Sequence, residues 1–199
     1  MPEVRRASEE DRPGAAAALA DAFFADPVWE FFFPDPDDRR PRIRRFFEVE
    51  TGHLPAGREM WVAGDAPAAA IWAPPGRWRP PVPHTAAVAP ALARVFGRRL
   101  IAAARAQNLI ERSHPEDEPH WYLHYLGAAP AAQGRGLGAA LMAPVLRRCD
   151  EQATAAFLET STPRARALYM RHGFEIVGEL DLPGGGPRIW QMWRPSRPT

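Results

Sequence analysis

Apolar residues recur along the chain at helical spacing in some segments and as short uninterrupted runs in others. Apolar positions three and four residues apart predict helices that bury one face. These helices span residues 38–53, 85–112, 136–150 and 163–172, after a first helix that starts at the capping-box-like pair Ser8 and Asp11 and runs to about Ala25. Short apolar runs bounded by Gly, Pro or Asp predict strands. These strands span residues 3–6, 59–63, 68–73, 121–128, 155–159, 174–179 and 188–194.

Two segments lack either pattern and are predicted as loops. Residues 28–36 are dense in aromatic side chains, and residues 74–83 hold five prolines. The strand at 121–128 shows no polar alternation, which is typical of a strand covered on both faces. Because a helix connects it to the strand at 155–159, these two strands are expected to be parallel. The order of elements predicts one α/β domain over residues 1–199, with helices packed on a sheet.

The composition narrows the expected partners. The 199 residues carry a formal net charge of +1, so no bulk charge favours nucleic acid or a membrane surface. No apolar run approaches the roughly 20 residues that span a bilayer. The charged N-terminus lacks the apolar segment of a signal peptide, so a cytoplasmic protein is expected. The single cysteine, Cys149, excludes an intrachain disulfide and a multi-cysteine metal site; we expect it to be buried, and we expect no metal.

A glycine-containing turn between a strand and a helix is the sharpest chemical signal. Residues 133–139 read Gln-Gly-Arg-Gly-Leu-Gly-Ala. Glycines allow a tight turn, and the following helix N-terminus offers unpaired N–H groups to a pyrophosphate. Gly134, Gly136 and Ala139 satisfy the dinucleotide pattern G-x-G-x-x-G/A, with Glu159 about 20 residues later. That fold requires further strand–helix units after Glu159, and only 40 residues remain.

The same turn also resembles the pyrophosphate loop of the GNAT acetyltransferases, Q/R-x-x-G-x-G/A, and the segments after the turn favour this second interpretation. From about residue 118 to 195 the chain is similar to the puromycin N-acetyltransferase branch of that family. The shared features are Pro119-x-Trp121, Ala129-Pro130, the mid-helix Pro144, the run Phe-Leu-Glu-Thr-Ser at 157–161, the Leu-Tyr and Gly-Phe pairs at 168–169 and 173–174, and Gly-Pro-Arg at 186–188.

The resemblance implies a fold and separate roles for the two halves of the chain. The implied fold is a GNAT fold: a mixed, mostly antiparallel sheet of 6–7 strands with a splayed parallel central pair, and helices on both faces. Residues 1–118 would shape the acceptor side, and residues 119–195 would bind acetyl-CoA as co-substrate. The residues implied to hold acetyl-CoA are Leu126, Gly127, Ala128, Gln133, Gly134, Arg135, Gly136, Leu137, Gly138, Ala139, Thr162 and Arg166. Thr162 stands where many members carry Asn at the start of the helix that bears the Leu-Tyr pair.

Acetyl transfer to an amine requires a proton donor for the leaving thiolate and a neutral attacking amine. The resemblance gives Tyr169 the role of general acid. For the base, His124 lies on the central strand and titrates near neutrality, whereas Glu159 ends the neighbouring strand. A chain of water molecules, or an amine of low pKa, would need neither residue.

Aromatic residues in the less similar N-terminal half suggest the acceptor pocket. Phe24, Trp29, Phe32 and Trp72 are the candidates, and a pocket lined by them would suit a small, partly apolar amine. A small-molecule amine is therefore the expected acceptor. A protein or peptide acceptor, or a non-catalytic acyl-CoA sensor, is left open. A monomer and a homodimer are both compatible with the sequence.

Overall fold

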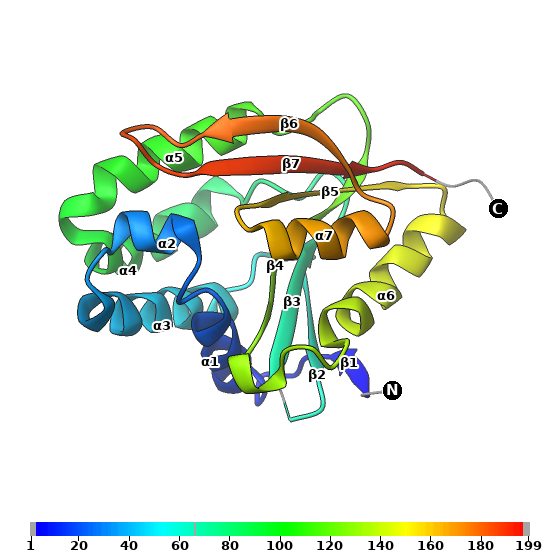
Figure 1. Ribbon diagram of the computed structural model, residues 1–199, viewed down its shortest axis with the longest axis horizontal. Coiled ribbons are helices and arrows are strands. Elements are labelled where there is room, and N and C mark those ends of the chain that lie inside the picture. Colours follow the sequence, from blue (N-terminus) through cyan, green and yellow to red (C-terminus); the bar gives the residue numbers. More distant parts are fainter. Residues whose placement is uncertain (1–2, 66, 197–199) are drawn as a thin grey trace.

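The computed structural model describes residues 3–65 and 67–196. Its strands are β1 (Val4–Arg6), β2 (Glu59–Ala63), β3 (Ala68–Ala73), β4 (His120–Ala128), β5 (Ala155–Thr160), β6 (Glu175–Asp181) and β7 (Arg188–Arg194). Its α-helices are α1 (Arg12–Ala22), α2 (Pro27–Phe32), α3 (Pro36–Gly52), α4 (Val82–Phe96), α5 (Leu100–Arg112), α6 (Leu137–Glu151) and α7 (Pro163–Arg171). The predicted strands are all found, with ends that differ by one or two residues (Figure 1).

The strands form one seven-stranded sheet in the order β1-β2-β3-β4-β5-β7-β6. The pair β4 and β5 is parallel, and the other neighbouring pairs are antiparallel. The β4–β5 pairing ends at Leu123 and Leu158, although β4 continues to Ala128 and β5 to Thr160. The central parallel pair therefore splays, which confirms the predicted fold class.

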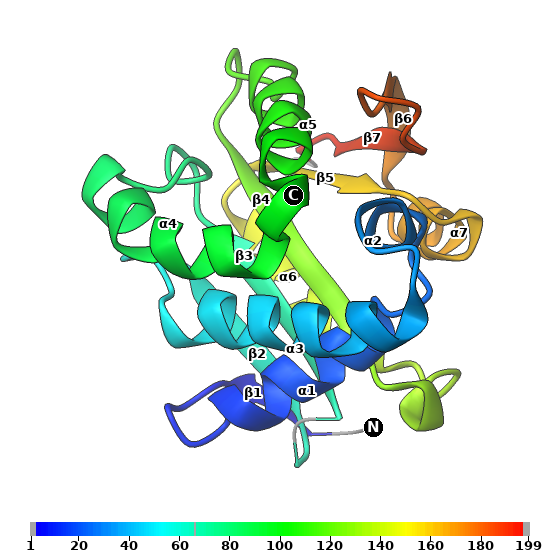
Figure 2. The same cartoon turned by 90° about the vertical axis from the view of Figure 1, so that its left-hand side faces the viewer.

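Helices cover the sheet on both faces, and each face has its own core. On one face α1 and α3 pack over β3 and β4, and α2, α4 and α5 lie on the same side (Figure 2). On the other face α6 packs on β2, β3 and β4, and the apolar side of α7 joins the same cluster. Cys149 lies in this second core with none of its surface exposed, as predicted. Among residues 3–65 and 67–196, no helix combines the length and apolarity needed to cross a membrane.

A β-bulge in β4 brings Tyr125 to the sheet face that Tyr122 and His124 already share. Ile71 of β3 pairs with Tyr125, whereas the next residue, Trp72, pairs with Leu123. His124 is the extra residue, and its ring lies 4.3 Å from that of Tyr125 and 5.3 Å from that of Tyr122. The bulge therefore gathers Tyr122, His124 and Tyr125 at the level where β4 and β5 part.

Two element predictions in the N-terminal half are wrong. The single helix predicted at 85–112 is two helices, because Gly97 adopts a left-handed φ of 50° and a short 3-10 turn follows it. The predicted loop at 28–36 contains α2, because the Asp26 carboxylate accepts a hydrogen bond from Val28 N and caps a helix that begins at Pro27. Sequence patterns missed α2 because six residues are too short to show a helical period.

Candidate active site

The site lies where β4 and β5 separate. Tyr122 pairs with Phe157 and Leu123 with Leu158, so His124 and Glu159 are the first residues beyond the ladder. Because Tyr122, His124, Phe157 and Glu159 keep the same phase along their strands, they lie on the same face of the sheet. The two base candidates from the sequence therefore lie at the same level and on the same face, on either side of the gap.

Glu159 has the electrostatics of a base that works near neutral pH. Burial raises the pKa of its carboxyl to about 7, and the polar groups of Tyr122 and Gln191 offset only part of that rise. Its Oε1 atom is buried and has no hydrogen-bond partner among the described residues. A carboxylate with a free oxygen and a pKa near the working pH can accept a proton from a bound amine.

His124 belongs to a second group of charges beside Glu159. Its Nε2 lies 3.7 Å from Glu50 Oε2 of α3, and the two side chains are 17% and 19% exposed. Burial lowers the pKa of His124, and the guanidinium of Arg58 lowers it further. Burial by itself would raise the pKa of Glu50, but His124 and Arg58 hold it below its ordinary value. His124 is therefore mostly neutral near pH 7, and Glu50 is ionised.

Tyr169, the predicted general acid, lies in the core on the opposite face, packed edge-on against Phe174. It is 6% exposed, and burial and the nearby Asp26 carboxylate both raise the pKa of its phenol. The phenol therefore stays protonated over the working pH range, which is the state that a general acid requires. A thiolate in the same environment also gains proton affinity, because burial disfavours every anion there.

The glycine turn has the geometry of an anion site. Gly134 and Gly136 have φ values of 80° and 76°, and a Cβ at either position would meet nothing within 4 Å. Backbone conformation, rather than crowding, therefore requires these two glycines. Helix α6 begins at Leu137, so the first N–H groups after the turn have no acceptor within the helix. Gly138 differs, because its Cβ would lie 3.0 Å from Leu168 of α7.

The other predicted acetyl-CoA residues surround the gap between β4 and β5. Residues Leu126, Gly127 and Ala128 pair with β3 on one side, and β5 does not pair with their other side. The side-chain amide of Gln133 donates to Ala128 O at 3.1 Å, and Arg164 donates to Gln133 Oε1 at 2.7 Å. This bridge joins the end of β4 to the first turn of α7.

Three of these predicted residues already have structural partners. The Thr162 hydroxyl caps α7 by accepting from Ala165 N at 3.3 Å. The guanidinium of Arg166 stacks over Trp190 at 4.4 Å. A Cβ on Gly127 would lie 2.7 Å from Ala22 Cβ, so this glycine lets α1 approach β4. Arg135 and Ala139 lie on either side of the start of α6.

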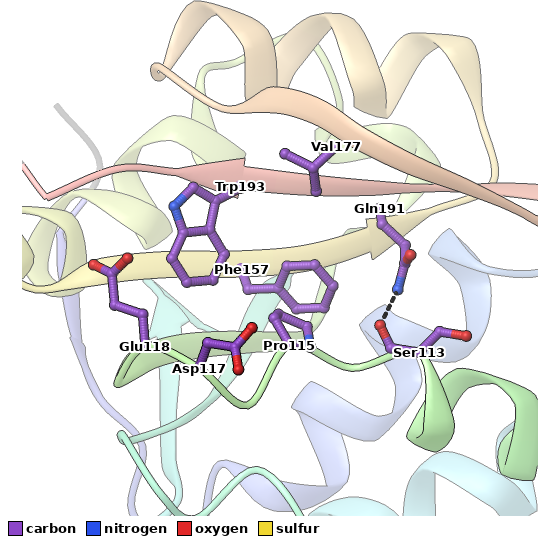
Figure 3. A pocket seen from close by; sticks show the side chains of 8 residues that line it. All are labelled: Ser113, Pro115, Asp117, Glu118, Phe157, Val177, Gln191 and Trp193. Carbon is purple, nitrogen blue, oxygen red and sulfur yellow. Dashed lines mark hydrogen bonds between the residues drawn. The ribbon is translucent and has the colours of Figure 1, made fainter.

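A cavity of about 360 Å³ opens on the sheet face that carries Phe157 and Gln191 (Figure 3). Glu159 shares that face, because it lies two residues after Phe157 and pairs with Gln191. Phe157 of β5 and its partner Trp193 of β7 form one wall, and Gln191, the partner of Glu159, lies at its edge. The full lining is Ser113, Pro115, Asp117, Glu118, Phe157, Val177, Gln191 and Trp193. The cavity is within the size range of small-molecule sites.

The predicted aromatic acceptor pocket is not assembled. Trp72, one of the predicted acceptor-pocket residues, is fully buried in the core on the α6 face and does not line the cavity on the Glu159 face. Trp29 and Phe32 are 7% and 6% exposed and pack around Phe96. Phe24 lies under the guanidinium groups of Arg39 and Arg40. Residues 28–36, which were predicted as a loop, are therefore part of the core, because aromatic residues distant in the sequence pack against them.

Sequence reasoning missed four residues of the site. Tyr122 and Gln191 flank Glu159, and Glu50 and Arg58 flank His124. Tyr122 carried a detectable signal, because it lies two residues before His124 on the same strand face. The other three come from elements far away in the sequence. No group of three or more His, Cys, Asp or Glu residues suited to a metal ion occurs in the described part of the chain.

The sheet has one splayed parallel pair, a glycine turn begins a helix beside it, and a titratable cluster borders the gap. This combination is that of an N-acetyltransferase. Residues 20–174 match the Acetyltransferase (GNAT) family, and the chain belongs to that family. The dinucleotide interpretation of the turn is wrong, because the described strands contain one parallel pair rather than a doubly wound sheet.

Relatives of known sequence or structure agree with this assignment. An N-acetyltransferase of Schizosaccharomyces pombe is 28% identical over 86% of this chain and 73% of its own length. A Corynebacterium glutamicum structure, described as histone acetyltransferase HPA2 and related acetyltransferase, has 30% identity and a TM-score of 0.74, covering 100% of this chain and 98% of that one. Arylalkylamine N-acetyltransferase 2 of Aedes aegypti shares the fold alone, with 11% identity, a TM-score of 0.58 and 98% and 99% coverage.

Proposed function

We propose that this enzyme moves the acetyl group of acetyl-CoA to a primary amine of a small molecule by direct attack, with Tyr169 as general acid and Glu159 as base. The observation that carries the proposal is the gap between β4 and β5. Glu159 borders it on one face of the sheet, and Tyr169 packs on the other. An acceptor and a donor arriving from opposite faces would meet between these two groups.

The donor side fits acetyl-CoA. The left-handed Gly134 and Gly136 present a turn to the N-terminus of α6, a suitable partner for a pyrophosphate. Beyond Leu123, the β4 edge that faces β5 is free of strand pairing, so its backbone groups can pair with an amide-containing arm. When bound, acetyl-CoA would supply an activated thioester. Residues 119–195 form this donor side, and their motifs favour the puromycin N-acetyltransferase branch of the family.

The proton-transfer roles follow from the local environments. An alkyl ammonium has a pKa near 10 in water and must lose a proton before it attacks. Glu159, with a pKa of about 7, can accept this proton at neutral pH. His124 is neutral but is already paired with Glu50, so we assign it to holding the acceptor-side charges rather than to the proton transfer. Tyr169 donates its proton on the other side of the gap.

A small acceptor is favoured by the cavity on the Glu159 face. Phe157 and Trp193 offer aromatic walls, and Asp117 and Glu118 supply negative charge at the rim (Figure 3). This combination suits an amine with an apolar body. Residues 1–118 supply the remaining acceptor side, including α2.

The test is thiol release from acetyl-CoA with a panel of aminonucleosides, aminoglycosides, amino acids, polyamines and peptides. Turnover with a small amine supports the proposal, whereas turnover with peptides alone overturns the small-molecule acceptor. On the best substrate, Tyr169→Phe should keep acetyl-CoA affinity and lower kcat at least about tenfold. Met170→Ala is the matched control, because that neighbouring side chain is 55% exposed. Equal turnover by Tyr169→Phe and wild type would remove Tyr169 from the acid role.

A further inference from the structure

Helices α2 and α7 begin at a shared hydrogen bond. Asp26 is the N-cap of α2, and its Oδ1 accepts from Val28 N at 2.9 Å. Its other oxygen, Oδ2, accepts from the hydroxyl of Ser161. Ser161 directly precedes Thr162, the N-cap of α7. One carboxylate therefore fixes the starts of two helices that lie far apart in the sequence.

Capping alone does not explain this arrangement. Asp35 caps α3 in the same way, with its carboxylate accepting from Asp37 N at 3.0 Å and a proline following it. Asp35 is exposed, whereas Asp26 is only 9% exposed. Burial of a carboxylate is unfavourable unless other groups compensate it. The buried position and the Ser161 contact of Asp26 therefore serve something other than the start of α2.

The position of Tyr169 indicates a second role for Asp26. Tyr169 lies on α7, eight residues after Ser161, and the charge of Asp26 is close enough to act on its phenol. On the other side of the bond, α2 carries Phe31, whose ring lies 3.2 Å from the Cβ position of Gly186 in the β6–β7 turn. The bond thus joins the short helix that packs on the β6–β7 turn to the helix that carries the proposed proton donor.

We propose that Asp26 and Ser161 are positioning residues for acetyl transfer, whose hydrogen bond sets where the Tyr169 hydroxyl stands relative to the acceptor. This inference rests on the proposed function for Tyr169. The Asp26 carboxylate also disfavours negative charge on neighbouring atoms, so it keeps the Tyr169 phenol protonated before the thiolate leaves. Neither residue needs to touch a reacting atom.

The first arm of the test is kinetic. Ser161→Ala should lower kcat about tenfold and leave the dissociation constant of acetyl-CoA, measured by calorimetry, within about twofold of wild type. Ser161→Thr, which restores a hydroxyl, should recover most of the rate. Asp26→Asn keeps the helix cap but removes the charge, and should also lower kcat. Asp35→Asn is the matched control and should change neither constant.

The second arm reads Tyr169 directly and needs no acceptor. The chain has three tyrosines, so 3-fluorotyrosine labelling gives a ¹⁹F spectrum in which the Tyr169→Phe variant identifies the Tyr169 signal. Ser161→Ala and Asp26→Asn should shift or broaden that signal, and Asp35→Asn should not. An unchanged Tyr169 signal in both variants overturns the inference, as does a fall in kcat that Ser161→Thr fails to recover. A wild-type protein that turns over no amine would instead overturn the proposed function, while this spectrum still decides the position of Tyr169.

Discussion

The raised pKa of Glu159 leads to a quantitative expectation for the pH dependence of the reaction. A base works only when it is deprotonated, so activity should be lost as the pH falls through the pKa of about 7. For a single group with that pKa, roughly 9% of the carboxyl is ionised at pH 6 and about 1% at pH 5. An ordinary glutamate, with a pKa near 4.3, would still be roughly 80% ionised at pH 5, so the rate would change little over this range.

The perturbation is Glu159→Gln, which keeps the size of the side chain and removes its charge. We expect kcat at pH 8 to fall by about 10²–10⁴-fold, the usual contribution of a general base. The residual rate should also lose its dependence on a group of pKa near 7. The assay is steady-state thiol release at saturating acetyl-CoA and amine from pH 5 to 8.5, with parallel dye-binding melts to confirm that each variant is folded.

A control variant separates Glu159 from its neighbour. His124→Asn removes the neighbouring imidazole, which was the other base candidate, and the fall in kcat near pH 7 should persist in this variant. Ionisation of the amine itself affects wild type and variants equally, so only the difference between their profiles is used. If Glu159→Gln keeps the wild-type profile and rate, Glu159 is not the base. If His124→Asn abolishes the dependence, the role belongs to His124.

Three further predictions concern stability and reactivity. Burial lowers the pKa of His114 to about 3, from about 6.5 when unfolded, so the neutral ring contributes stability above pH 6.5 that is lost as pH falls. Between pH 7 and pH 5 this group should lower the free energy of unfolding, measured in urea, by about 2 kcal/mol. His114→Gln should reduce that drop, whereas His53→Gln, at an exposed position, should not. An equal pH dependence of stability in the two variants would contradict the burial of His114. Gly127→Ala should destabilise the protein by about 1–3 kcal/mol in the same assay, because the new Cβ would lie 2.7 Å from a carbon of α1. At Gly52 a Cβ would have no atom within 4 Å, so Gly52→Ala should be neutral or stabilising. Equal effects of the two substitutions would show that the contact between α1 and β4 is not crowded at Gly127. Cys149, with no exposed surface and a pKa raised to about 12 by burial, should react with a thiol reagent only as fast as the protein opens, so fast labelling of the native state would show that it is accessible.

Local patterns were sufficient for most elements and for the glycine turn. The run at 121–128 and the turn after it are close together in the chain, so the strand, the turn and the helix that follows could be predicted without knowing what packs near them. The same holds for β2 and β3, whose predicted bounds match the structure. A contiguous segment contains its own hydrophobic periodicity and turn residues, so its secondary structure can be predicted from the sequence.

The acceptor side depends on contacts between distant segments, and there the sequence was misleading. Trp72 looked like a candidate for the acceptor pocket, but the phase of β3 turns it toward α6 and away from Glu159. Trp29 and Phe32 looked like loop residues, but Phe96, at the end of α4, covers them. No local pattern carries that information.

The sequence by itself determined the family fold, the glycine turn and the identity of Tyr169 and Glu159 as candidates. The tertiary structure alone decided how those groups are tuned. The pKa of Glu159 depends on burial among β4, β5 and β7, and the pairing of His124 with Glu50 depends on the packing of α3 over β4. The hydrogen bond between Asp26 and Ser161 joins residues 135 positions apart. Burial and long-range partners exist only once the chain is folded, and they are what sets a pKa or fixes a hydroxyl in place.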